Sequence, residues 1–444
     1  MKRTLFEYDK WEKVKNITAL FHSLKTIWQQ RDFSNFSEEL EENETDKNFQ
    51  PFLRFLNDEI RANNYVGFIQ TEYDLIEIYP KVFRNYPNKE KKDMLRHIFF
   101  WFNYCRKWKF PFSHIQLDVS NIDEFPELII NLIANQFLEV VSNQPLTIYQ
   151  PTEEAMQTPR GSINFKRYIA NSLVSGNFQD IECDYEPFLF DNKVNRSIKY
   201  CSRLLMNQTK FAENVQMLQE VIFILDEVED VPCTNYDLDN IVLNSFFDEY
   251  SRVLDSCKLI LNQQLYSSNT YDLSQWSLLF PMEYIFEDFV AGFLEEKFSE
   301  SWKVECQKSN EYLSSIPKAF NMQHDIFLTS KNADRRKIII DTKYKLRPID
   351  FKNDIKKGIV QSDLYQMTSY AFRRGCTDVF LLYPNLTDNI NEPDVFEIHS
   401  GFNTNDKIKV TAMEIPFWTM EKLDIIKLEN KLYNTFKRAL NQYD

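Results

Sequence analysis

Two aspartates and one lysine in the last third of the 444-residue chain could act together on a substrate. Asp325 precedes one apolar run, the triplet from Asp341 to Lys343 follows the next, and a polar hexamer at 331–336 separates the runs. The apolar runs predict two strands, and the hexamer predicts a turn. A hairpin folded about Ala333 sets Asp325 opposite Asp341, with Cβ atoms about 5 Å apart. Lys343 lies two residues further along, so its side chain leaves the same strand face.

This trio predicts metal-assisted chemistry on a phosphate. Two carboxylates at that range suit a hard divalent cation such as Mg²⁺, for which Mn²⁺ can substitute. A neighbouring lysine can orient or deprotonate a water molecule and can offset phosphate charge. A bare Asp-x-Lys triplet also fits a solvated strand end. The context favours a metal-dependent site, because three isoleucines precede the triplet, an acid lies one hairpin earlier and a helix follows.

The charge distribution favours a polyanionic substrate. The chain carries 52 Lys and Arg against 66 Asp and Glu, a formal net charge of -14. The segment 331–357 is nevertheless basic, since ten Lys and Arg minus four Asp give a local charge of +6, and Arg373 and Arg374 extend it. Such a patch is expected where a surface contacts phosphates, although a charge run can also be a solvated face.

The trio resembles the site of the PD-(D/E)xK nucleases. Asp325 stands for the first acid of that pattern, with His324 in place of the usual proline, and Asp341 and Lys343 stand for its D-x-K half. The resemblance implies that the two aspartates hold the cation and that the lysine acts beside them. Strict alternation along a strand directs the His324 side chain to the opposite face, which disfavours a ligand role for it.

Two helices extend the resemblance. Gln366 and Tyr370 are spaced i, i+4 on a helix predicted at 361–370, and this Q-x-x-x-Y pattern resembles the RecB-like branch, which implies that Gln366 supports the site. Superfamily members often carry a glutamate on a helix before the hairpin, which implies a catalytic or metal-binding role for Glu287; Glu283 lies one turn away. The same two patterns are also typical of amphipathic helices that pack on a sheet, expose a charged face and have no catalytic role.

The order of motifs along the chain resembles the McrC family, the nuclease subunits of McrBC-type 5-methylcytosine restriction systems. The resemblance covers roughly residues 60–390, and the first sixty residues match no pattern of that family. The segments that carry it are a predicted hairpin at 65–81 that ends in I-x-P-K, 159–165, 191–199, Phe286-Glu287, Asp341-Thr342-Lys343-Tyr344-Lys345 and Asp363-Leu364-Tyr365-Gln366-Met367.

The resemblance implies a division of labour between two proteins. The chain is expected to be a Mg²⁺-dependent endodeoxyribonuclease subunit that cuts double-stranded DNA, while its partner recognises the DNA sequence. It is also expected to stimulate that partner, a hexameric AAA+ GTPase or ATPase resembling McrB. Paired subunits are expected to bridge two motor rings. Two alternatives stay open: an adaptor that activates the motor without cutting, and a nuclease subunit of a system directed at a fixed, unmodified sequence.

Composition excludes several other classes. The closest two of the 7 glycines, Gly161 and Gly176, are too far apart for a P-loop or a dinucleotide-binding fingerprint, so a motor must be a separate protein. The 7 cysteines contain no C-x-x-C, which predicts reduced thiols in the cytoplasm rather than a zinc ribbon or a disulfide framework. The sequence contains no run of 18 apolar residues, so no membrane span is predicted.

The predicted fold class is α/β, with three consecutive regions. Residues 1–150 are expected to form an α+β partner-binding region, and residues 151–265 a mainly helical stalk with long helices at 197–228 and 244–263. Residues 266–444 are expected to form the PD-(D/E)xK nuclease domain, in which a mixed sheet is flanked by helices.

Overall fold

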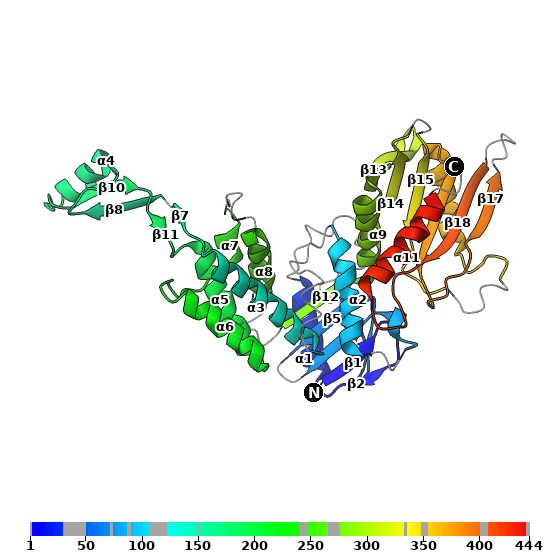
Figure 1. Ribbon diagram of the computed structural model, residues 1–444, viewed down its shortest axis with the longest axis horizontal. Helices are drawn as coiled ribbons and strands as arrows, with labels where there is room; N and C mark the ends of the chain where they lie inside the picture. The colour runs from blue at the N-terminus through cyan, green and yellow to red at the C-terminus, as the bar shows by residue number, and fades with distance from the viewer. Residues whose placement is uncertain are drawn as a thin grey trace. The chain divides into compact units, whose positions relative to one another are not determined.

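In the computed structural model the chain forms two compact units (Figure 1). The first unit joins Met1–Phe125 to Ser277–Asp444, and the second is Pro126–Trp276. This division differs from the three consecutive regions predicted from the sequence. The structure describes residues 2–29, 50–71, 74–86, 90–106, 122–149, 151–239, 241, 243, 247, 249–264, 276–332, 335–347, 354–399 and 407–440.

A six-stranded mixed sheet forms the C-terminal part of the first unit. Its order is β13-β14-β15-β16-β18-β17, in which β15, β16 and β18 run parallel and the other neighbours run antiparallel. This is the mixed α/β architecture that the sequence predicts. The elements are β13 (Trp302–Ser315), β14 (Lys318–Ser330), β15 (Lys337–Thr342), β16 (Asp378–Pro384), β17 (Asp394–His399), β18 (Lys407–Ile415), α9 (Met282–Phe298), α10 (Gln361–Arg374) and α11 (Ile425–Leu440).

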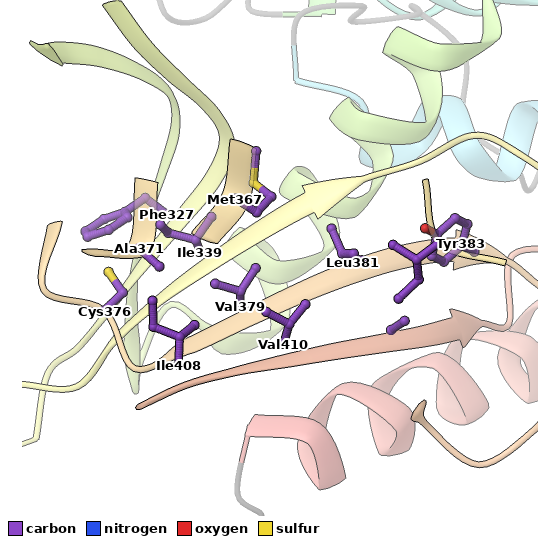
Figure 2. Close-up of a cluster of buried hydrophobic side chains, with 12 residues drawn as sticks. Phe327, Ile339, Met367, Ala371, Cys376, Val379, Leu381, Tyr383, Ile408 and Val410 are labelled. Atoms are coloured by element: carbon purple, nitrogen blue, oxygen red, sulfur yellow. The ribbon is translucent and has the colours of Figure 1, made fainter. Parts of the chain in front are cut away.

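Helices cover both faces of this sheet. Alternate strand residues, among them Phe327, Ile339 and Val379, pack against Met367 and Ala371 of α10 in one buried cluster (Figure 2). Side chains one residue along each strand point to the opposite face. There α9 packs against β13, β14 and β15, and α9 and α11 lie side by side (Figure 1). The end of β15 therefore lies between two packed layers.

A second sheet in the first unit takes one strand from far along the chain. Gly67 in β5 has φ +137°, and a Cβ there would lie 1.9 Å from the Leu278 carbonyl oxygen of β12, so this close approach requires glycine. α2 (Lys91–Tyr104) also packs against α9. These two contacts explain why residues 1–125 form one unit with the C-terminal sheet. The strand order is β1 (Lys2–Phe6), β6 (Leu75–Tyr79), β5 (Tyr65–Gln70) and β12 (Trp276–Pro281).

Smaller elements complete residues 1–125. β5 and β6 pair antiparallel, which confirms the predicted hairpin. A three-stranded sheet has the order β2-β4-β3. These elements are β2 (Glu12–Lys13), α1 (Ile17–Gln29), β3 (Leu53–Leu56), β4 (Glu59–Ala62) and the short helix η3 (Lys81–Phe83).

The second unit contains a helical body. The single helix predicted at 197–228 is wrong, because α5 ends at Gln208 and α6 begins at Ala212. The Glu127 carboxylate accepts hydrogen bonds from the Thr209 hydroxyl and, at 2.8 Å, from the Lys210 N–H, so it satisfies one side-chain donor and one backbone donor at the break. The helices are α3 (Phe125–Asn143), α5 (Lys193–Gln208), α6 (Ala212–Ile224), α7 (Asn235–Leu238) and α8 (Glu249–Gln264).

A small β module is inserted between α3 and α5. Its sheet has the order β8-β10-β9, and β7 pairs with β11 at its base. None of the helices that the structure describes, here or in the first unit, is long and apolar enough to cross a bilayer. The elements are β7 (Ile148–Tyr149), β8 (Thr152–Met156), β9 (Ser162–Ile163), α4 (Phe165–Arg167), the π-helix η5 (Tyr168–Leu173), β10 (Ile181–Tyr185) and β11 (Phe188–Leu189).

Candidate functional site

The register of β14 and β15 brings the two predicted acids together. Ile326 lies opposite Ile340, and the same register continued by one residue sets Asp325 opposite Asp341. Thr342 donates both its N–H and its hydroxyl to Asp325 Oδ2, each at 2.7 Å. The predicted pairing is therefore correct, although the predicted turn centre at position 333 lies outside the described residues.

Asp341 is a buried carboxylate next to a second negative charge. Only 3% of the residue is exposed, and Lys343 Nζ lies 2.8 Å from its Oδ2. Burial raises the pKa of Asp341 to about 7 and the charge of Asp325 adds to that rise, while Lys343 opposes it. A carboxylate in this environment is stabilised in its charged form by any further cation that binds beside it.

Lys343 keeps its proton at the site. Burial lowers the pKa of Lys343, but the charges of Asp341, Asp363 and Asp325 outweigh burial and leave the pKa above its ordinary value. A protonated ammonium donates hydrogen bonds and cannot take a proton from water. Of the two roles predicted for this lysine, the raised pKa favours orienting water and stabilising negative charge over acting as a base.

A third carboxylate, which the sequence analysis did not select, completes the charged cluster. Asp363 lies in the first turn of α10, and its Oδ2 is 3.7 Å from Lys345 Nζ. Its charge acts on both Asp341 and Lys343. The signal in the sequence was an acid three residues before Gln366, since that spacing puts two side chains on one helix face.

Gln366 and Tyr370 share a face of α10, as their spacing predicts. Gln366 Nε2 donates to the Tyr370 hydroxyl at 3.2 Å, and Gln366 itself is exposed. The Tyr370 ring centroid is 5.2 Å from that of His324, so the histidine points towards α10 and not to the opposite face expected from strict alternation. The β13–β14 pairing shifts register just beyond Lys308, the partner of His324, and such a bulge re-aims side chains.

The two candidate glutamates of α9 act on different neighbours. Glu287 is half-buried, and its charge contributes to the raised pKa of Cys306 on β13. Glu283 is exposed, and its charge contributes to the raised pKa of Tyr344, the residue after Lys343. The role predicted for Glu287 stays a prediction.

The donor set fits a cation held by few protein ligands. The residues that the structure describes include no group of three or more His, Cys, Asp or Glu side chains arranged to hold a metal ion. Asp325 and Asp341 offer carboxylate oxygens, and Mg²⁺ is commonly held by one or two carboxylates with several waters. Among the described residues, the carboxylates of Asp341 and Asp363 pair with the ammonium groups of Lys343 and Lys345, and Asp325 adds a further negative charge that a cation can offset.

Comparison with known proteins decides the family. A protein-family model described as "McrBC 5-methylcytosine restriction system component" matches residues 60–384. The chain belongs to the McrBC family. The match begins in β4 and ends with β16, so it includes Lys81 and the whole candidate site, whereas β1 lies outside it. A search of the curated proteins found no match.

Solved structures of McrBC assemblies share the fold. A half-complex from a tetradecameric assembly of Thermococcus gammatolerans McrB AAA+ hexamers with bound McrC contains a chain that is 15% identical, with a TM-score of 0.71, over 99% of this chain and 100% of that one. A cryo-EM structure of the Thermococcus gammatolerans McrBC complex matches with 17% identity and a TM-score of 0.52, over 67% of this chain and 88% of that one. At these identities the likeness shows a common fold, as the predicted resemblance to McrC implies.

Proposed function

We propose that this chain is the endonuclease subunit of an McrBC-type restriction system, directed at DNA with modified cytosine. The observation that carries the proposal is the convergence of Asp325, Asp341 and Lys343 at the end of one hairpin. Membership of a 5-methylcytosine restriction family supports the biological context. The reaction would be hydrolysis of a DNA phosphodiester bond.

Each side chain of the cluster has a defined task in that reaction. Asp325 and Asp341 would hold Mg²⁺, which when bound supplies a Lewis acid for the phosphate and a more acidic water. Thr342 donates two hydrogen bonds to Asp325 Oδ2 and so holds this carboxylate beside Asp341. Lys343 would orient the attacking water and stabilise charge on the phosphate, with Gln366 in a supporting position and Glu287 a further candidate ligand.

Removal of divalent metal tests this proposal. Cleavage of methylated DNA by the chain together with its AAA+ partner and nucleotide is expected to stop in EDTA and to return with Mg²⁺ or Mn²⁺. Nucleotide hydrolysis must be measured separately, because the motor also needs Mg²⁺. Preformed complexes are diluted into buffer with limiting metal, and DNA cleavage and nucleotide hydrolysis are measured side by side on methylated and unmethylated DNA. This comparison separates the metal requirement of cleavage from that of the motor. Absence of cutting under every metal condition, with motor stimulation intact, would favour the adaptor alternative.

An AAA+ motor is the partner that this function requires. The Thermococcus gammatolerans assembly contains McrB AAA+ hexamers with bound McrC, and we infer that this chain binds a hexamer of the same kind. The glycine spacing excludes a P-loop in the chain itself. Two rings bridged by a pair of these subunits would bring two nuclease sites to one DNA duplex.

The small β module of the second unit is the surface that we assign to motor contact. Large exposed apolar side chains mark interaction sites when they gather in one place. Within residues 165–178 five such side chains are 36% to 79% exposed. This apolar tip consists of Phe165, Ile169, Leu173, Val174 and Phe178.

Replacing Phe165 and Phe178 with serine is expected to weaken motor stimulation by about thirtyfold or more, because the loss of even one buried aromatic anchor at an interface costs about 2 kcal/mol. Both side chains are exposed, at 66% and 65%, so the chain should fold normally. Phe223→Ser is the matched control, since Phe223 is 79% exposed on α6 of the same unit. Equal stimulation by the double variant and the wild type would rule out the apolar tip as the motor contact.

A further inference from the structure

A buried polar cluster joins the N-terminal sheet to the strand that carries Lys343. Glu7 follows β1, Lys81 follows β6, and Tyr344 follows β15 by two residues. Glu7 is 0% exposed and Tyr344 is 3% exposed. The cluster therefore links three segments that lie up to 337 residues apart in sequence, all within the first unit.

Tyr344 is held at both its side chain and its main chain. Its hydroxyl donates to Glu7 Oε2 at 2.8 Å, and the same oxygen accepts the Lys81 backbone N–H at 2.8 Å. Lys81 Nζ donates to the Tyr344 carbonyl oxygen at 2.6 Å and lies 4.1 Å from the centroid of the Tyr344 ring. These contacts fix Tyr344, the residue that directly follows Lys343.

The neighbouring main chain is also fixed on its other side. The Lys343 N–H donates to the Leu382 carbonyl at 2.8 Å, and the Lys345 N–H donates to the Lys343 carbonyl at 2.7 Å. The chain thus leaves β15 through a short bend that these two main-chain hydrogen bonds hold. A long lysine side chain has many rotamers, so a fixed backbone at its base limits the positions that its ammonium can reach.

Burying the charged groups of this cluster costs desolvation free energy that apolar side chains would not require. Burial raises the pKa of Glu7 to about 7, although Lys81 and Tyr344 oppose the rise, and burial lowers the pKa of Lys81. Apolar side chains of similar size can fill such a position without desolvating a charge. The cluster also includes Lys81 of the I-x-P-K segment, which the proposed function leaves without a role.

We propose that Glu7 and Lys81 are positioning residues for DNA cleavage: they lock Tyr344 and thereby hold Lys343 in place beside Asp325 and Asp341. The inference rests on the proposed nuclease function and assigns part of the nuclease site to the N-terminal sheet. It predicts that damage to the cluster slows the chemical step more than it weakens DNA binding or motor stimulation.

Tyr344→Phe and Glu7→Gln in the full-length chain, assembled with its motor, test this proposal. Tyr344→Phe keeps the ring in its aromatic surroundings and removes only the hydroxyl. Both variants are expected to lower kcat for DNA cleavage by about tenfold or more, the size expected when a hydrogen bond to a charged group is lost. KM for DNA and stimulation of nucleotide hydrolysis should stay within about twofold of wild type.

Glu77→Gln is the matched control. Glu77 is 0% exposed on the same sheet, but its carboxylate bonds to Lys91 and to the Phe125 N–H, away from the D-x-K strand. This variant is expected to lose thermal stability, as Glu7→Gln can, without a selective fall in kcat. A fall in kcat of the same size in Glu77→Gln would show that any damage to the sheet slows cleavage, and would overturn the proposal.

The outcomes separate the inference from the function on which it rests. Cutting by the wild-type complex, with unchanged kcat in Tyr344→Phe and Glu7→Gln, would overturn the positioning role alone. If the wild-type complex stimulates its motor but never cuts DNA, the proposed function and the positioning role both fall. A selective loss of kcat in both variants, absent in the control, supports the proposal even if Glu7→Gln folds less stably.

Discussion

Asp341→Asn is expected to reduce DNA cleavage by the complete complex by about a thousandfold, a loss of about 4 kcal/mol of transition-state stabilisation. The substitution keeps the shape of the side chain and removes the charge that faces Asp325 and Lys343. The variant loses one of the two carboxylates proposed to hold the divalent cation, so the site binds that cation less tightly. Stimulation of nucleotide hydrolysis should be unchanged, because we assign motor contact to the other unit.

Stability should not explain that loss. The pKa of Asp341 is raised to about 7 in the folded chain, so the unfolded chain releases this proton at lower pH than the folded chain does. The free energy of unfolding that depends on this group therefore falls as pH rises from about 4 towards 7. A neutral amide removes that term, so Asp341→Asn should melt no lower than wild type at pH 7.5.

Asp378→Asn provides the matched control for this experiment. Asp378 lies at the start of β16 in the same sheet, is 8% exposed and pairs with Arg336 at 3.2 Å. Loss of this pair should lower the melting temperature and leave cleavage close to wild type at permissive temperature. If the Asp341→Asn variant cleaves DNA at the wild-type rate, in the complete complex with metal present, the assignment of the site is refuted.

Local patterns were sufficient to predict the pairing of the two acids. A strand period of two residues and a polar turn of fixed length leave one register for the hairpin, and that register sets Asp325 opposite Asp341. The same period places Lys343 on the face of Asp341. The structure confirms this geometry, because every step depends on residues within about twenty positions of one another.

Contacts between distant segments could not be predicted in this way. Asp363 reaches the site only because α10 docks on the sheet after a connection that includes residues 348–353, which lie outside the described residues. Glu7 meets Tyr344 across 337 positions, and no periodicity in either segment indicates the other. The orientation of His324 depends on a bulge in the neighbouring strand, which alternation along its own strand cannot reveal.

The strand β12 helps to join residues 1–125 to the C-terminal sheet in one unit. β12 comes directly after the second unit in sequence, yet it completes the N-terminal sheet beside β5. A chain cut near residue 265 would leave the edge of β5 unpaired and would separate α2 from α9. Tests of motor binding should therefore use point variants of the full-length chain and not fragments cut at the predicted boundary near residue 265.

The chain without its partner is expected to cut DNA at least about a hundredfold more slowly than the complex, and without sequence choice. The charges on Lys343, Lys345, the exposed Lys356 and the half-buried Lys357 can contact phosphates but carry no base information. Affinity that comes from phosphate contacts falls steeply as salt rises, so the lone chain should bind weakly at physiological ionic strength.

A cleavage assay at physiological salt, with the chain alone, with its AAA+ partner and with a non-hydrolysable nucleotide, measures this dependence, and Asp341→Asn supplies the background rate. Double-strand cuts should require the partner, hydrolysable nucleotide and DNA long enough to engage two complexes, because each site cleaves one strand and two sites must meet. Lowering the salt should raise random nicking by the lone chain and should not restore site choice. Efficient, site-specific double-strand cutting by the chain alone would instead identify a self-sufficient restriction endonuclease, in which base recognition lies within these 444 residues.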